Sequence, residues 1–416
     1  VVHGLPASDV VAYRRLGGSW QRVRDVRTAA EPGGFAAFVA AGDVPRGDWW
    51  VASRAAFFQP AVDALPPAAD ILSGAATWLA ISRPAFDASL APLVARRRAQ
   101  GLASDVVDVE QIYRRYSGGT PDPAAITAYL RDAVALRGTR YVLIAGGDTY
   151  DYADNLGIGS VSLVPTAYAR TSDVIRYAPA DGLLADLDGD ELADLPIGRL
   201  PARSPADLDA LVAKILAYES GTSREALLVA GAAEAGGSFR TATDDFAAQL
   251  PGAWQFARAY VDDLGVPGAR AALLDGFGRG PGLVSFYGHS APGQWTFDPI
   301  FTAADVATLG NAGHPSLVLQ WGCWNTYFVA PAANTLAHSL LLTPERGASA
   351  AFGSTALTEV ASHAALGNLL FPELATGTRV GDAVLAAQRR VALASPERRD
   401  AWLGTALLGD PAMPLR

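Results

Sequence analysis

Apolar and polar residues recur with two different periods along most of the chain, which predicts a mixture of strands and helices. Short apolar runs at 76–83, 103–110 and 140–148 predict buried strands, and amphipathic stretches at 84–101 and 122–138 predict helices. The order strand, helix, strand, helix, strand is typical of a parallel sheet with crossover helices. We therefore expect an α/β unit in this part of the chain.

A second series of the same kind follows further along. The segments that we expect in it are a helix at 204–220, a strand at 225–234, a helix at 241–254 and strands at 282–289 and 315–323. Together the two series predict an α/β fold built from two consecutive halves.

The N-terminal part has a different pattern. Its short runs rich in Trp and Val are bounded by Gly and Pro, which predicts strands. We expect a β-rich segment at 1–68, a linker around Pro66 and Pro67, and α/β halves at 69–222 and 223–416. The first segment is interpreted as an accessory domain or as a pro-segment that masks a cleft.

Composition narrows the class of protein. Half of the 416 residues are apolar, which is enough for a folded core, and the apolar stretches fall short of the roughly 20 residues that span a bilayer. We expect no transmembrane segment. A net charge of −9 argues against nucleic acid as a partner, because such proteins normally carry a basic face. The chain begins at Val1, without an initiator Met or signal peptide, so we expect a processed piece.

Two predicted strands end in reactive side chains, His289 and Cys323, and the latter is the only cysteine. Ligands and catalytic groups gather at the carboxyl ends of parallel strands, so neighbouring strands would bring imidazole and thiol together. An imidazole activates a cysteine nucleophile by taking its proton. A lone cysteine after an apolar run is also a common packing residue, and both interpretations stay open on this pattern. The remaining histidines, predicted in surface, turn or helix positions, are His3, His314, His338 and His363.

Several motifs in order carry a family resemblance. The segments "SFYGHSAPGQW", "LQWGCWNTYF", "GASAAFGSTALTE" and "LLGDPAMPLR" resemble those of the gingipain-type cysteine peptidases, and the likeness extends over roughly residues 70–416. That family has the caspase-like fold, so the resemblance implies a parallel-sheet core in two α/β halves. It also implies cleavage of peptide bonds in a protein or peptide substrate.

The resemblance assigns the catalytic dyad to His289 and Cys323. It implies an oxyanion hole made by the backbone N–H groups of Cys323 and Ser290. The family usually has glycine after the histidine, and a positive φ at that position would be strained in a serine. Glu234 matches a glutamate that orients the histidine in arginine-specific members; the alternative is a solvated loop residue.

A specificity pocket is implied further along the chain. Asp245, with Asp244 beside it, matches the family's acidic determinant, which would pair with an arginine or lysine of the substrate. The alternative is an aspartate in the first turn of a helix. Trp321, Trp324 and Trp295 are candidates for the pocket walls, although tryptophans near strand ends are often core residues.

An acidic segment at 181–194 suggests a structural calcium site. Asp186, Asp188 and Asp190 alternate with other residues as oxygen ligands do in calcium loops. The EF-hand pattern is incomplete, since Ile197 stands at its twelfth position, and an acidic surface turn is the alternative. We expect no cofactor to be required for the chemistry.

The sequence therefore predicts a secreted or cell-surface cysteine endopeptidase that forms a thioester acyl-enzyme. Two alternatives remain, a sortase-like transpeptidase with the same dyad and an inactive, peptidase-derived binding or scaffold protein.

Overall fold

The computed structural model describes residues 1–16, 19–40, 48–58, 69–234 and 237–415. The chain forms two compact units, Val1–Pro66 and Pro67–Arg416. The linker expected around Pro66 and Pro67, and the boundary expected after residue 68, lie outside the described residues. Each unit is described by itself.

The smaller unit contains β-strands, as its sequence pattern predicts. Its strands are β1 (Val2–Leu5), β2 (Val10–Leu16), β3 (Ser19–Val23), β4 (Val26–Glu31), β5 (Gly34–Val39) and β6 (Trp49–Ser53), followed by the 3-10 turn η1 (Arg54–Ala56). They form two antiparallel sheets with strand orders β1-β5-β4 and β3-β2-β6.

The larger unit begins with a parallel sheet of strand order β12-β9-β7-β8. Its strands are β7 (Trp78–Ser82), β8 (Ser104–Asp108), β9 (Tyr141–Ala145) and β12 (Ile197–Leu200). Its helices are α1 (Asp87–Ala99), α2 (Val109–Tyr116), α3 (Pro123–Arg137) and α4 (Pro205–Ser220). The residues of α1 and α4 pack into one apolar core and those of α2 and α3 into a second, so the helices cover opposite faces.

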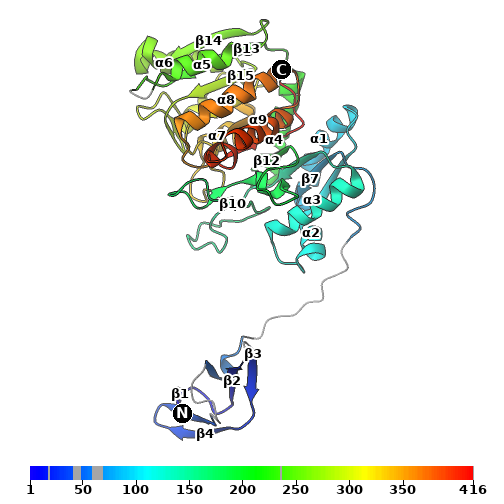
Figure 1. Ribbon diagram of the computed structural model, residues 1–416, viewed down its shortest axis with the longest axis vertical. Coiled ribbons are helices and arrows are strands. Elements are labelled where there is room, and N and C mark those ends of the chain that lie inside the picture. Colours follow the sequence, from blue (N-terminus) through cyan, green and yellow to red (C-terminus); the bar gives the residue numbers. More distant parts are fainter. Residues whose placement is uncertain (17–18, 41–47, 59–68, 235–236, 416) are drawn as a thin grey trace. The chain divides into compact units, whose positions relative to one another are not determined.

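The second sheet has the order β14-β13-β15-β19-β20-β21, in which only β21 runs antiparallel. Its strands are β13 (Glu225–Ala230), β14 (Gln255–Tyr260), β15 (Leu283–Tyr287), β19 (Ser316–Trp321), β20 (Ala348–Ser354) and β21 (Thr405–Leu408). The helices of this half are α5 (Phe239–Ala247), α6 (Val261–Gly278), α7 (Leu336–Leu342), α8 (Val360–Ala375), α9 (Val380–Ala394) and α10 (Arg399–Trp402). Figure 1 shows α8 and α9 side by side against this half.

Short elements connect the sheets. They are η2 (Pro84–Phe86), β10 (Tyr168–Ala169), β11 (Ala178–Pro179), η3 (Asp181–Ala185), β16 (Ser290–Ala291), β17 (Gln294–Trp295), β18 (Phe301–Thr302) and η4 (Ala303–Thr308). Strands β16, β17 and β18 form a small antiparallel sheet directly after β15.

The two halves meet where β12 lies against β21. Gly198 has no side chain there because a Cβ would come within 2.3 Å of the carbonyl oxygen of Gly409. Beside this junction the buried guanidinium of Arg97 pairs with Asp410 at 2.9 Å and with Glu219 at 2.6 Å. The C-terminal "GDP" segment is thus tied into the core of the first half.

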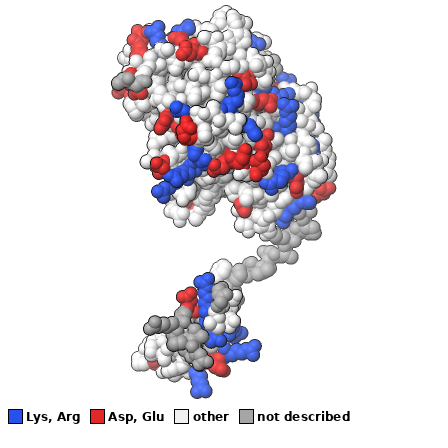
Figure 2. Space-filling view, in the orientation of Figure 1, with Lys and Arg blue, Asp and Glu red and all other residues white. Residues whose placement is uncertain are grey.

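Residues of both parallel sheets pack into one apolar core within the larger unit. The helix expected at 241–254 is wrong in its bounds, because Ser238 caps a helix that starts at Phe239 and ends at Ala247. Among the described residues no helix is both long and apolar enough to cross a membrane. On the face of the larger unit in Figure 2, acidic and basic side chains are interspersed.

Candidate active site

His289 and Cys323 follow two neighbouring parallel strands. Tyr287 of β15 pairs with Trp321 of β19, and each reactive residue stands two positions beyond its paired residue. Adjacent strands lie about 4.8 Å apart, so the register brings the backbones of the two residues to the same edge of the sheet. The strand register is therefore compatible with the predicted approach of imidazole to thiol, which stays a prediction.

Glu234 lies beyond the carboxyl end of the next strand in the sheet, β13, which pairs with β15 through Ala230 and Tyr287. The backbone groups of Glu234 and Gly237 hydrogen-bond to each other. The Glu234 carboxylate lies 2.9 Å from Nε2 of His289. Because a carboxylate can only accept, this contact places the ring proton on Nε2 and leaves the lone pair on Nδ1.

Two phenylalanines hold the imidazole ring. Phe297 stacks on it with 4.9 Å between ring centroids, and Phe239 meets it edge-on at 5.6 Å. Phe297 is 73% exposed, so the stacking leaves one side of the ring close to solvent. The ring orientation is thus fixed by one hydrogen bond and two aromatic contacts.

The thiol of Cys323 contacts the backbone of Thr358. The N–H of Thr358 lies 3.5 Å from Sγ, and its carbonyl oxygen lies 3.5 Å from the same sulfur. Burial raises the pKa of the Cys323 thiol, the Thr358 N–H lowers it, and the charge of Asp400 raises it. The net pKa lies above its usual value, so the resting group is a protonated thiol.

The turn that carries the thiol is tightly constrained. A Cβ on Gly322 would approach the Ser290 hydroxyl to 2.3 Å, which explains the glycine before the cysteine. Trp324, directly after it, has a φ of 64°, a conformation that costs a non-glycine residue about 1 kcal/mol. Its N–H donates to the carbonyl of Ala356 at 3.1 Å, which helps to hold the turn.

Ser290 is not strained, in contrast to the expectation for a residue in place of glycine. It lies in β16, outside the positive-φ residues, and its hydroxyl donates to the carbonyl of Cys323 at 2.8 Å. In the hairpin of β16 and β17, the Thr296 N–H donates to the carbonyl of His289. Hydrogen-bonded and non-hydrogen-bonded pairs alternate along an antiparallel ladder, so the next pair, Ser290 and Trp295, is not hydrogen-bonded. The Ser290 N–H therefore points away from its hairpin partner.

Two of the three tryptophans that were expected to line a pocket are core residues. Trp295 and Trp321 are 0% and 1% exposed, and their indole N–H groups donate to Gln320 and Ser285. Neither offers a surface to a substrate, because both are enclosed by aromatic and apolar neighbours. Trp324 is half-buried and packs edge-on against Tyr327 at 5.1 Å.

Asp244 and Asp245 lie in the second half of α5, not in its first turn. Asp244 accepts hydrogen bonds from Arg258 at 3.1 Å and from Tyr260 at 2.8 Å, both on the edge strand β14. Asp244 is thus already paired with an arginine of its own chain. Asp245 is exposed on the same helix.

The acidic segment forms a compact turn with a different set of carboxylates from the expected one. Asp186, Asp188 and Asp194 each offer an oxygen within 4.8 Å of the others, whereas Asp190 accepts the N–H of Leu192. The loop folds back through Gly189 and Glu191, which both have positive φ. Three carboxylate oxygens at this spacing fit the oxygen preference of calcium.

Comparison with known proteins identifies the family. The model of peptidase family C25 matches residues 71–416. The chain belongs to peptidase family C25. It is therefore a cysteine peptidase, and the expected family resemblance is confirmed.

Solved structures show the fold of this C25 peptidase in other chains. The crystal structure of the Arg-specific cysteine proteinase gingipain R is 18% identical, covers 85% of this chain and 80% of that one, and has a TM-score of 0.68. The complex of the Porphyromonas gingivalis RgpB pro- and mature domains is also 18% identical, covers 81% and 79%, and has a TM-score of 0.68. A search of curated proteins gives no match. The caspase-like fold is thus confirmed.

The sequence did not reveal three contributors to the site of this C25 peptidase. Thr358 touches the thiol, the charge of Asp400 adds to the rise in the thiol pKa that burial causes, and Phe297 stacks on the imidazole. Thr358 lies in the segment "GASAAFGSTALTE", which was quoted for its family resemblance without a role for this residue. His338 and His363 are buried in helices, and burial lowers the pKa of each to about 3, so neither is a base near neutral pH.

Proposed function

We propose that the protein is a secreted or cell-surface cysteine endopeptidase that works through Cys323 and His289. The observation that carries the proposal is the convergence of Glu234, His289 and Cys323 at the carboxyl ends of three adjacent strands, β13, β15 and β19. This is the edge of a parallel sheet at which catalytic groups gather.

In the proposed mechanism Sγ of Cys323 attacks the scissile carbonyl carbon while Nδ1 of His289 takes the thiol proton. Glu234 holds the other ring nitrogen and stabilises the imidazolium that forms. The imidazolium then gives its proton to the leaving amine, and a thioester remains on Cys323. Water, deprotonated by the same imidazole, hydrolyses the thioester and regenerates the thiol.

The developing oxyanion needs donors that point to its position. The backbone N–H of Ser290 turns away from its hairpin partner, and the loop of Ser290 is bonded to the carbonyl of Cys323. These two observations support the N–H groups of Ser290 and Cys323 as the oxyanion hole.

The raised pKa of Cys323 favours general-base catalysis over a preformed ion pair. A half-buried thiol near the negative charge of Asp400 keeps its proton at rest. The proton therefore leaves during the attack, and the rate depends on a correctly placed neutral imidazole.

A preference for a basic residue next to the cleaved bond is part of the proposal. It is supported by the similarity in fold to a structure described as an Arg-specific cysteine proteinase. Asp245 was the carboxylate expected from the sequence to provide it, with Asp244 beside it. The pairing of Asp244 with Arg258 makes Asp245 the better of the two.

The experiment is turnover of a peptide library by the wild type, Cys323→Ser and His289→Ala, with products identified by mass spectrometry. We expect hydrolysis by the wild type and a loss of at least about 1,000-fold in kcat/KM in both variants. An added amine nucleophile shows whether the thioester is also passed to an amine, as in a transpeptidase. Full turnover by Cys323→Ser would refute the mechanism.

A further inference from the structure

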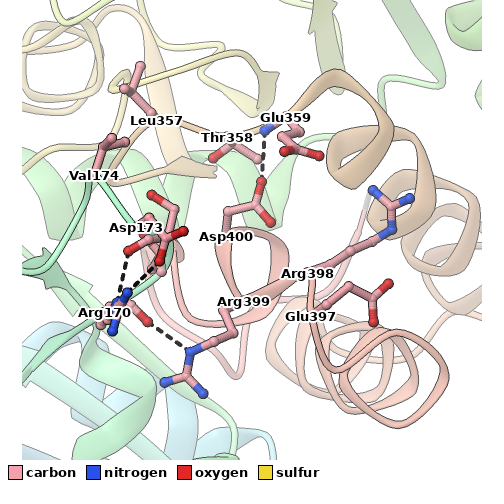
Figure 3. A pocket seen from close by; sticks show the side chains of 12 residues that line it. Arg170, Asp173, Val174, Leu357, Thr358, Glu359, Glu397, Arg398, Arg399 and Asp400 are labelled. Atoms are coloured by element: carbon pink, nitrogen blue, oxygen red, sulfur yellow. Dashed lines mark hydrogen bonds and ion pairs between the residues drawn. The ribbon is translucent and has the colours of Figure 1, made fainter.

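Each of the two units carries a cavity, and the two cavities differ in character. In the larger unit a cavity of about 790 Å³ adjoins Thr358, whose backbone groups contact the sulfur of Cys323, so it belongs to the proposed active site (Figure 3). In the smaller unit a cavity of about 380 Å³ is lined by Tyr13, Trp20 and Trp50. Its volume falls within the range of roughly 300–1,000 Å³ that is typical of small-molecule sites. The proposed peptidase mechanism uses none of these three aromatic residues.

The three aromatic side chains project from one face of the sheet β3-β2-β6. Tyr13 on β2 pairs directly with Trp50 on β6 and with Arg22 on β3, and directly paired residues of an antiparallel sheet point to the same face. Trp20 lies two residues before Arg22 on β3, which places it on this face as well. Trp20 and Trp50 are 52% and 49% exposed. The rings are therefore accessible to a ligand.

Neighbouring rings hold Trp50 in place. It stacks on Phe57 with 5.5 Å between ring centroids and an interplanar angle of 16°, and it is tilted against Tyr13 at 5.9 Å. Single exposed apolar residues are common on protein surfaces, whereas exposed rings that gather around one cavity are typical of interaction sites. Rings that are already fixed offer apolar faces to a ligand at a low cost in conformational entropy.

The charge beside the rings is positive. The guanidinium of Arg22 forms no hydrogen bond or ion pair with the part of the chain that the structure describes. Arg15, on the same face, lies 3.6 Å from Asp48, so the charge of that carboxylate is already balanced. A guanidinium binds a carboxylate through two parallel hydrogen bonds. The face is therefore suited to a ligand that carries carboxylates together with apolar ring surfaces.

A sugar chain with acidic units meets both requirements. The faces of aromatic rings are electron-rich, so the C–H groups on one side of a pyranose ring stack on them while the hydroxyl groups at its edge stay hydrated. A uronic acid adds to each sugar ring a carboxylate that Arg22 can bind. Proline-rich peptides also dock on aromatic grooves, but they would leave the charge of Arg22 unused.

We propose that the smaller unit is a binding module for an acidic polysaccharide, whose sugar rings stack on Tyr13, Trp20 and Trp50 and whose carboxylates bind Arg22. This favours an accessory domain over a pro-segment as the interpretation of the N-terminal segment. It does not depend on the proposed function, because no residue of this face takes part in the peptidase mechanism.

The test measures the affinity of the full-length protein for polygalacturonate, for the same polymer after methyl esterification and for a proline-rich peptide. Esterification removes the charge and keeps the sugar rings, so wild type should bind polygalacturonate at least about tenfold more tightly than the ester. Arg22→Gln should weaken binding of polygalacturonate at least about fivefold and leave binding of the ester unchanged. Arg27→Gln, at an exposed arginine of β4 in the other sheet, is the matched control and should change either affinity less than about twofold.

The tryptophan variants test the contribution of the rings. Trp20→Ala and Trp50→Ala should each weaken binding of both polymers at least about fivefold. Phe38→Ala, which removes a 46% exposed ring from the other sheet, should change either affinity less than about twofold. Arg22→Gln alters an exposed side chain, so it decides the matter even where a tryptophan variant lowers the Tm.

Three results would overturn the proposal. They are no binding of polygalacturonate by wild type, equal losses in Arg22→Gln and Arg27→Gln, and tighter binding of the proline-rich peptide than of polygalacturonate. A rise in peptidase turnover in Trp50→Ala with unchanged polysaccharide binding would also overturn it, because the face would then act as a pro-segment. An inactive peptidase that binds polygalacturonate through Arg22 would contradict the proposed function and support this proposal.

Discussion

The hydroxyl of Ser290 donates a hydrogen bond to the backbone carbonyl of Cys323 across 2.8 Å. This bond joins the loop after the histidine to the turn that carries the nucleophile. It also explains why Gly322 lacks a side chain, since a Cβ there would collide with the same hydroxyl. The residue that departs from the family pattern thus makes a structural contact of its own.

Replacing Ser290 by glycine should therefore weaken the fold more than the chemistry. The variant loses one largely buried hydrogen bond and gains backbone freedom, which together cost about 1–2 kcal/mol of unfolding free energy. The backbone N–H remains, so kcat/KM should stay within about threefold of wild type. Denaturant unfolding and peptide turnover check this, with Ser290→Ala as the control that removes only the hydroxyl. Loss of activity without loss of stability would contradict it.

Asp400→Asn should make Cys323 more reactive toward alkylating agents. The charge of Asp400 raises the pKa of the thiol, so its removal lowers that pKa and increases the thiolate fraction at any pH below it. The rate of reaction with iodoacetamide at pH 7 should therefore be higher in Asp400→Asn than in wild type. The asparagine keeps an oxygen for the N–H of Glu359, which limits damage to the start of α8. A slower reaction of Asp400→Asn with an unchanged Tm would contradict the claim that the Asp400 charge raises the pKa of the thiol.

Glu234→Gln tests the orientation of the imidazole. A glutamine amide can donate to Nε2 and so select the wrong tautomer, in which Nδ1 carries the proton and cannot accept one from the thiol. We expect kcat to fall about 10- to 100-fold with little change in KM, because in the proposed mechanism Glu234 acts on the imidazole and not on the substrate. Glu234→Asp is the matched control that keeps the charge. Equal kcat values for wild type and Glu234→Gln would remove Glu234 from the mechanism.

Calcium should stabilise the protein through the acidic turn. Asp186, Asp188 and Asp194 bring carboxylate oxygens together, and a bound ion at about 100 times its Kd adds about 2.7 kcal/mol of unfolding free energy. The Tm measured in calcium should exceed that in EDTA by several degrees. Asp188→Asn should abolish most of the difference, whereas Asp190→Asn should keep it. Identical Tm values in calcium and EDTA would rule the site out.

The sequence predicted those parts of the site that depend on strand periodicity. His289 and Cys323 follow apolar runs, and parallel strands deliver their ends to one edge, so these two residues could be placed together without a structure. The buried tryptophans could not be separated from pocket residues in this way. A side chain at the end of a strand can point into the core or toward solvent. Only the packing of Trp321 against its neighbours in the structure shows that it points into the core.

Contacts between distant loops were beyond sequence reasoning. Thr358 reaches the thiol from the loop before α8, and Asp400 comes from α10, so no local pattern connects them with Cys323. For a related reason, the carboxylates that lie together in the acidic turn differ from the set expected from the sequence, and calcium binding stays a prediction. Regular spacing suggested Asp190, but the positive φ of Glu191 folds the chain back and brings in Asp194.

The most direct test of the central claim is covalent labelling by a peptidyl electrophile that carries arginine, followed by peptide mapping under reducing conditions. The account predicts one adduct per chain, on Cys323, formed at least about 100-fold more slowly in His289→Ala. No adduct on Cys323, with or without calcium, would contradict the assignment of this thiol as the nucleophile.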